Sequence, residues 1–315
     1  MSDQPFKQFL DRELHSRDAK EHYRAQIDLL KDVVNFGSNL IHSCFTSSKR
    51  TLGDVVVIAV ILKQLVMMLD AYQVLIAEAC TEAAKLQCRA LFEASIYIDW
   101  ILLSDKERKA LYYYAANVRK ELLWVRRAIP VDTEQDNFFK NLGEFGRTLE
   151  KTREKLATIA PSRLKQLEEF LSKEPFVSIS ADFDKAKGKR PYDPPWHVPL
   201  GEKSIRSLSK AVGRLHEYEI FYMQLSETMH GARHTSHVKI KKGHITIEPM
   251  RHLERLSTSL NFTLSIIFHT YRKIIEYYCP TQSTEFSKKY RKDWQDAFMN
   301  IPRIKYQEAS DEVAI

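Results

Sequence analysis

Residues 55–75 read VVVIAVILKQLVMMLDAYQVL, and this stretch decides the fold class. Apolar side chains would surround almost the whole circumference of a helix formed here, which is typical of a helix inside a bundle. The uninterrupted apolar run from Val55 to Leu62 is eight residues long, and a membrane-spanning helix needs about 20. We therefore predict a buried central helix, in which Lys63 and Asp70 must reach an edge or a partner.

Helical periodicity continues on both sides of this stretch. Glycine and proline are scarce, at 9 and 11 residues, and long helices tolerate few of either. The sequence predicts an all-α fold, a helical bundle of about ten helices. The other predicted helices cover residues 17–45, 81–103, 104–129, 132–159, 161–173, 201–230, 249–279 and 283–300.

Two segments depart from the helical pattern. Residues 175–200 contain five prolines, so we predict an irregular, basic crossover without a helix. Alternating apolar residues on both sides of Lys241-Lys-Gly243 predict one short β-hairpin insertion near 237–248. The expected organisation is an N-terminal helical arm over 1–50, a bundle core over 51–280, and a basic terminal helix with a polar tail over 281–315.

Charge and cysteine content limit the class of protein. The net charge is +7, and the four cysteines show no CxxC pair or metal-type spacing. The first residues are charged where a secretory signal needs an apolar run. We expect a cytoplasmic protein with reduced thiols, no cofactor and no membrane segment.

A basic surplus lies between residues 151 and 215, where 14 Lys and Arg face 8 Asp and Glu. A surplus of this kind attracts polyanions such as RNA, although a solvated loop gives the same pattern. The predicted substrate-binding residues in its densest part are Lys185, Lys187, Lys189 and Arg190.

Residues 226–237, SETMHGARHTSH, form the densest group of chemically active side chains. His230 and Arg233 suit acid–base work on a phosphodiester, with the arginine stabilising charge on the phosphate. Two other interpretations stay open: His230, His234, His237 and His244 hold a metal ion, or His230 only stabilises a helix end.

Arg89 and Glu93 stand four residues apart inside an apolar helix and therefore share one face. The pair is either an intrahelical salt bridge or a group that orients an imidazole of the 226–237 segment.

These two motifs together resemble an uncharacterised group of bacterial all-helical proteins, similar to the HEPN superfamily. The resemblance covers roughly 60–260 and implies a metal-independent endoribonuclease of a toxin or antiphage system, often a homodimer. It also implies an arginine and a histidine separated by four to six residues. Arg17 with His22 and Arg190 with His197 fit that spacing.

The sequence thus supports a HEPN-like, RNA-directed effector as the leading hypothesis. His230 would act as general acid or base and Arg233 would contact the phosphate. Glu227 and Glu93 would orient these groups, Arg89 would support them, and His234 and His237 would bind substrate. The first alternative is a non-catalytic binding or regulatory protein, and the second is a metal-dependent hydrolase that uses the histidine cluster.

Overall fold

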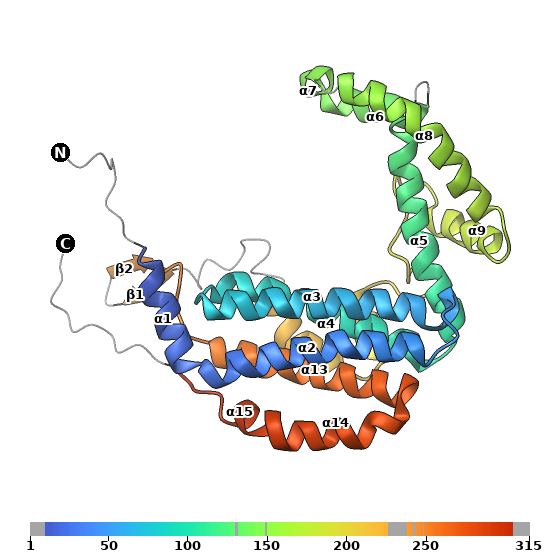
Figure 1. Ribbon diagram of the computed structural model, residues 1–315. Coiled ribbons are helices and arrows are strands. Elements are labelled where there is room, and N and C mark those ends of the chain that lie inside the picture. The colour runs from blue at the N-terminus through green and yellow to red at the C-terminus, as the bar shows by residue number, and fades with distance from the viewer. Residues whose placement is uncertain are drawn as a thin grey trace, which may run out of the picture. The chain divides into compact units, whose positions relative to one another are not determined.

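The computed structural model describes residues 10–129, 132–148, 150–225, 238–241, 244–247 and 249–304 (Figure 1). Helices dominate these residues, so the all-α prediction is confirmed. The chain forms two compact units. The first, which we call the bundle unit, comprises 1–50, 58–103 and 208–315, and the second, the inserted unit, comprises 51–57 and 104–207.

Four long helices build the bundle unit: α2 (Arg24–Thr46), α3 (Val57–Ala77), α4 (Thr81–Leu103) and α13 (Leu256–Tyr278) (Figure 1). Helix α13 packs against both α4 and α2. Shorter elements complete the unit: α1 (Arg12–His22), α10 (Ile205–Ala211), α11 (Leu215–Glu217), a π-helical turn (Tyr218–Tyr222), α14 (Ser283–Lys289) and α15 (Gln295–Met299).

Helix α3 is largely buried, as its apolar sequence predicts, with Ile58, Leu62, Leu65 and Leu69 inaccessible to solvent. It is not enclosed on all sides, however, because one face stays exposed and carries Lys63 and Asp70. By length and composition, Leu52–Ala77 would suffice to cross a membrane, and 56% of its most apolar window is buried. A core helix of a soluble protein meets the same criterion.

A close approach of α2 and α13 fixes the packing of the bundle unit. The Tyr271 side chain lies directly against Gly37 and donates a hydrogen bond of 3.1 Å to the Val33 carbonyl. A side chain at position 37 would occupy the space of this ring. The glycine therefore lets a large buried aromatic residue sit between the two helices.

The single helix predicted over 17–45 is wrong in detail, and the helical region predicted over 201–230 is interrupted within its described part. The first divides into α1 and α2 at Tyr23, whose ring is fully buried and whose hydroxyl donates to the Pro302 carbonyl at 3.0 Å. The second breaks near Gly213, which adopts a φ of 76° that interrupts a right-handed helix.

The inserted unit contains a π-helical turn (Leu52–Val56), α5 (Lys106–Arg126), α6 (Thr133–Leu142), α7 (Glu144–Thr148), α8 (Glu150–Leu171) and α9 (Phe176–Lys187). Helix α9 corrects the prediction of an irregular 175–200 crossover. Pro175 precedes its first turn and the other four prolines follow Gly188, so residues 176–187 contain no proline. Helix α8 likewise runs through Pro161, where the sequence predicted a new helix.

Two short strands, β1 (Val238–Lys241) and β2 (His244–Ile247), pair in antiparallel register with Val238 opposite Ile247. On β2, Ile245 and Ile247 are exposed. The strands therefore add little to the core, and the class of the protein remains all-α.

Candidate functional site

Only part of the predicted catalytic set lies in the described residues. Arg89 and Glu93 are described, on the third and fourth turns of α4. The predicted site residues of the 226–237 segment lie outside the described residues: Glu227, His230, Arg233, His234 and His237. Of the predicted catalytic residues, the structure therefore shows the surroundings of Arg89 and Glu93 alone.

Arg89 and Glu93 form an ion pair, with 3.0 Å between Arg89 Nε and Glu93 Oε1. Tyr222, at the end of the π-helical turn, donates its hydroxyl to the same carboxylate oxygen at 2.6 Å. The Arg89 guanidinium also lies 5.1 Å from the centre of the Tyr222 ring, within cation–π range. The three side chains thus form one cluster, which joins α4 to the chain that precedes residues 226–237.

Electrostatics keep this cluster in a defined protonation state. Burial alone would lower the pKa of Arg89, but the hydrogen bond and charge of Glu93 outweigh burial and raise it. Burial, together with the neighbouring Glu93, raises the pKa of Tyr222 well above its usual value. Tyr222 therefore remains a neutral donor, and Glu93 is held by two donors in one orientation.

A second cluster on the same helix was not predicted from the sequence. Arg214 is buried and donates from Nη1 to Asp99 Oδ2 at 2.7 Å and to Ser95 Oγ at 2.6 Å. Its Nε and Nη2 donate to the two carboxylate oxygens of Glu217 at 2.8 and 2.7 Å. This fork geometry, with a carboxylate on each side, is the arrangement that a planar guanidinium matches best.

His269 of α13 completes this second cluster. Its Nε2 lies 2.9 Å from Asp99 Oδ2 and 3.1 Å from Oδ1. Burial alone would raise the pKa of Asp99, but the hydrogen bonds and charges of His269 and Arg214 outweigh burial and lower it. Asp99 is therefore ionised and accepts hydrogen bonds only, so the proton between the two groups belongs to His269 Nε2.

The imidazole of His269 is 38% exposed and lies beside a small open cavity of about 240 Å³. The cavity is lined by Asp99, Leu102, Leu103, Val212, His269, Lys273, Glu276 and Tyr277. A carboxylate that fixes one nitrogen of a partly exposed histidine is an arrangement used for acid–base chemistry. The same arrangement also serves simply to neutralise a buried carboxylate.

The two clusters both include residues of α4 and contact each other through Phe92. The Phe92 ring is 5.4 Å from the Tyr222 ring and 5.4 Å from the Arg214 guanidinium. A sequence signal for the second cluster existed, because Ser95 and Asp99 are polar residues four apart in an apolar helix. Its partner, Arg214, carried no signal of its own, because the pairing depends on a tertiary contact.

The predicted substrate-binding lysines belong to the inserted unit. Lys185 and Lys187 lie in the last turn of α9, where cations stabilise the negative end of the helix dipole. Lys185, Lys189 and Arg190 are exposed, and Lys187 Nζ is 3.9 Å from Asp193. These residues lie at the solvent-exposed end of α9, where a polyanion could reach the exposed cations.

The two arginine–histidine pairs that fit the HEPN spacing differ in their surroundings. His197 is buried, and its Nδ1 lies 2.6 Å from the Glu202 carbonyl, so it cannot face a substrate together with exposed Arg190. Burial lowers the pKa of His197, despite the opposing effect of Glu202. Arg17 and His22 are both exposed on α1. Five residues of helix turn them about 140° apart.

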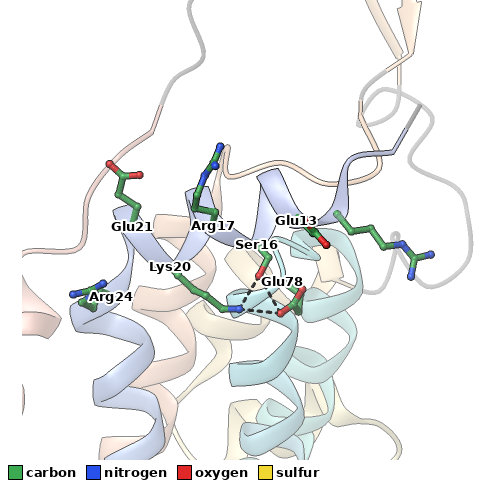
Figure 2. Close-up of a pocket in the computed structure, with 8 residues that line it drawn as sticks. Glu13, Ser16, Arg17, Lys20, Glu21, Arg24 and Glu78 are labelled. Carbon is green, nitrogen blue, oxygen red and sulfur yellow. Dashed lines mark hydrogen bonds and ion pairs between the residues drawn. The ribbon is translucent and has the colours of Figure 1, made fainter. Parts of the chain in front are cut away.

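Arg17 lines an open hollow of about 920 Å³ at α1 (Figure 2). Figure 2 shows Lys20 and Ser16 turned toward Glu78, and Arg17 turned away from it. Lys20 Nζ lies 2.7 Å from Ser16 Oγ and 3.3 Å from Glu78 Oε1. Arg251 reaches the Glu78 backbone carbonyl at 2.7 Å. The bond from Lys20 attaches α1 to the residue that follows α3, and the bond from Arg251 attaches the chain before α13 to the same residue.

No group of three His, Cys, Asp or Glu side chains among the described residues is placed to hold a metal ion. The histidines proposed as metal ligands fall at 230, 234 and 237, outside those residues, with His244 on β2. The metal interpretation of the sequence therefore stays a prediction.

The fold and its two clusters define the class: an all-α helical bundle in which Arg214 and Tyr222 bond to polar residues of α4. The chain belongs to a family of unknown function, DUF5677, whose model matches residues 55–243. The matched region includes Arg89, Glu93, Asp99, Arg214 and Tyr222. No curated protein and no solved structure matches the chain.

Proposed function

We propose that this protein is a HEPN-like bacterial effector, a metal-independent endoribonuclease of a toxin or antiphage defence system, acting in the cytoplasm. The observation that supports this proposal is the clamp on Glu93. Arg89 and Tyr222 both bond Glu93 Oε1, at 3.0 and 2.6 Å. Tyr222 stands eight residues before His230, so the clamp attaches the chain leading into the histidine segment to a rigid helix.

The reaction needs one group to accept a proton and another to stabilise negative charge. In this mechanism His230 takes the proton of an RNA 2′-hydroxyl as that oxygen attacks the neighbouring phosphorus. The bond from phosphorus to the 5′-oxygen breaks, and the released oxygen takes a proton from an acid or from water. Arg233 neutralises the charge that develops on the phosphate. Glu227 and Glu93 orient these groups and Arg89 supports Glu93. The products are a cyclic phosphate and a 5′-hydroxyl.

Charge supports a nucleic-acid substrate. The protein carries a net charge of +7, and Lys185, Lys189 and Arg190 are exposed on the inserted unit. Cations of this kind attract a phosphate backbone irrespective of base sequence. The proposal assigns substrate binding to Lys185, Lys187, Lys189, Arg190, His234 and His237.

The decisive experiment compares the wild type with His230→Ala and Arg233→Ala on a fluorescent single-stranded RNA in the presence of EDTA. The matched control is His216→Ala, because the His216 side chain is 69% exposed and lies outside the proposed machinery. We expect cleavage by the wild type and the control, and a loss of roughly a hundredfold or more in the two variants. Wild-type activity in His230→Ala, or intact RNA with the wild-type protein, would overturn the proposal.

One observation favours a second candidate, a non-catalytic binding or regulatory module. Every guanidinium nitrogen of Arg214 is bonded to a side chain of the same network, as in a structural lock. Under this alternative the 226–237 segment contacts a partner and cleaves nothing. Overexpression of the wild type followed by analysis of total cellular RNA separates the two, because only the nuclease degrades it. Stoichiometric zinc or manganese in the purified protein would favour a metal-dependent hydrolase instead.

A further inference from the structure

Helix α3 presents a regular apolar row to solvent. Val60, Met67 and Val74 expose 52, 55 and 52% of their surfaces, although most of the helix is buried. These residues are spaced by seven, the repeat with which one helix face packs along another helix. Isolated exposed apolar residues are ordinary, so the regular spacing on one helix face is the feature that distinguishes this row.

Two opposite charges lie in the same exposed row. Lys63 and Asp70 are both exposed, on either side of Met67. Within the part of the chain that the structure describes, neither makes a hydrogen bond or an ion pair. The row thus reads Val60, Lys63, Met67, Asp70, Val74, with apolar residues at the ends and centre and opposite charges between them.

This row is complementary to itself when reversed. We propose that α3 pairs with α3 of a second copy of this chain in antiparallel orientation, about a two-fold axis through Met67. Val60 of one copy then packs on Val74 of the other, and Lys63 faces Asp70 in two equivalent contacts. A contact of the same patch with itself is the rule for two-fold dimers. The proposal does not depend on the nuclease hypothesis.

Charge selects the antiparallel orientation. In a parallel pair, Lys63 would face Lys63 and Asp70 would face Asp70, and like charges at close range repel. In the antiparallel pair, Lys63 lies four residues before the axis and Asp70 three residues after it. The two charges therefore come within about 1.5 Å of the same level along the helix axis, which the long lysine side chain spans easily.

The dimer should be modest in affinity, because one helix pair buries less surface than a standard interface of about 1,600 Å². Sedimentation equilibrium of the full-length protein over roughly 1–200 µM measures it. Lys63→Glu places Glu against Asp70, and Asp70→Lys places Lys against Lys63. We expect each to weaken dimerisation roughly tenfold, and the double variant to restore it to within about threefold.

Cysteine cross-linking tests the orientation independently. Met67→Cys stands on the proposed axis and should give a covalent dimer on mild oxidation, beyond the background of the wild type with its native cysteines. Val60→Cys should not, because in the antiparallel pair the two copies of residue 60 lie about 21 Å apart along the axis. Equal cross-linking through both positions would mean a parallel pair and would overturn the proposal.

Two further results would contradict the dimer. A monomer at all concentrations, with no cross-link through Met67→Cys, would show that another part of the chain or no partner covers this face. The same helix is apolar enough to suit a bilayer. Binding of the wild type to phosphatidylcholine vesicles in a flotation assay, abolished by Met67→Glu, would therefore assign the row to a membrane and contradict the dimer.

Discussion

Arg214 Nη1 lies 2.7 Å from Asp99 Oδ2, although 115 residues separate the two in the chain. Both side chains are buried, with exposed fractions of 6%. Their contact joins α4 to the chain that follows Gly213, and His269 adds α13 to the same carboxylate. This network is the point at which three separate parts of the sequence are held together.

Replacement of Arg214 by Met should destabilise the protein by about 3–5 kcal/mol, because Asp99 and Glu217 would lose the cation between them. Urea unfolding followed by circular dichroism measures the change. Arg291→Met, at an exposed position, is the control and should alter the free energy of unfolding by less than about 0.5 kcal/mol. A loss below about 1 kcal/mol in Arg214→Met would show that the network is not structural.

Asp99 should make stability depend on pH in the acid range. The pKa of its carboxyl is lower in the folded protein than its ordinary value of 3.8. Its ionisation therefore stabilises the fold above about pH 4, and this stabilisation is lost as the pH falls through the folded pKa. At pH 7, Asp99→Asn should have a much smaller free energy of unfolding than the wild type. Between pH 5 and pH 3, that free energy should fall by less in the variant than in the wild type. Parallel curves for the two proteins would refute this.

Tyr222→Phe should cost about 1–2 kcal/mol of stability, because the variant removes a 2.6 Å hydrogen bond to Glu93 and keeps the ring packing. If the clamp positions the histidine segment, the same variant should also lower RNA cleavage, measured at a temperature well below its midpoint of thermal unfolding. Tyr192→Phe, at an exposed tyrosine, should change neither quantity. Unchanged cleavage in a destabilised Tyr222→Phe would limit the cluster to a structural role.

Gly37→Ala should destabilise the bundle unit by about 3 kcal/mol, since overpacking in a rigid core is not relieved cheaply. A Cβ at this position would lie 2.7 Å from both Tyr271 Cζ and Val66 Cγ2. Thermal unfolding by calorimetry measures the loss. Ser38→Ala on the exposed side of α2 is the comparison, and near-equal midpoints for the two variants would contradict the close packing.

Local sequence patterns predicted part of the candidate site. The i, i+4 spacing of Arg89 and Glu93 correctly predicted an ion pair on one face of α4, because that spacing depends only on helix geometry. The hypothesis that these residues serve the 226–237 segment stays a prediction, since Glu227, His230, Arg233, His234 and His237 lie outside the described residues. Tyr222, the third member of the cluster, was not predicted.

By itself the sequence determined the all-α class and the buried core of α3, because helix periodicity and the scarcity of glycine and proline act over a few residues. It misplaced the helices around 175–200, where the positions of the prolines mattered more than their number. Only the tertiary structure decided that Arg214 and His269 both bind the Asp99 carboxylate, and that one side of α3 is exposed. The physical reason is that burial and charge pairing depend on which distant segments pack together, and periodicity in a single helix does not specify its neighbours.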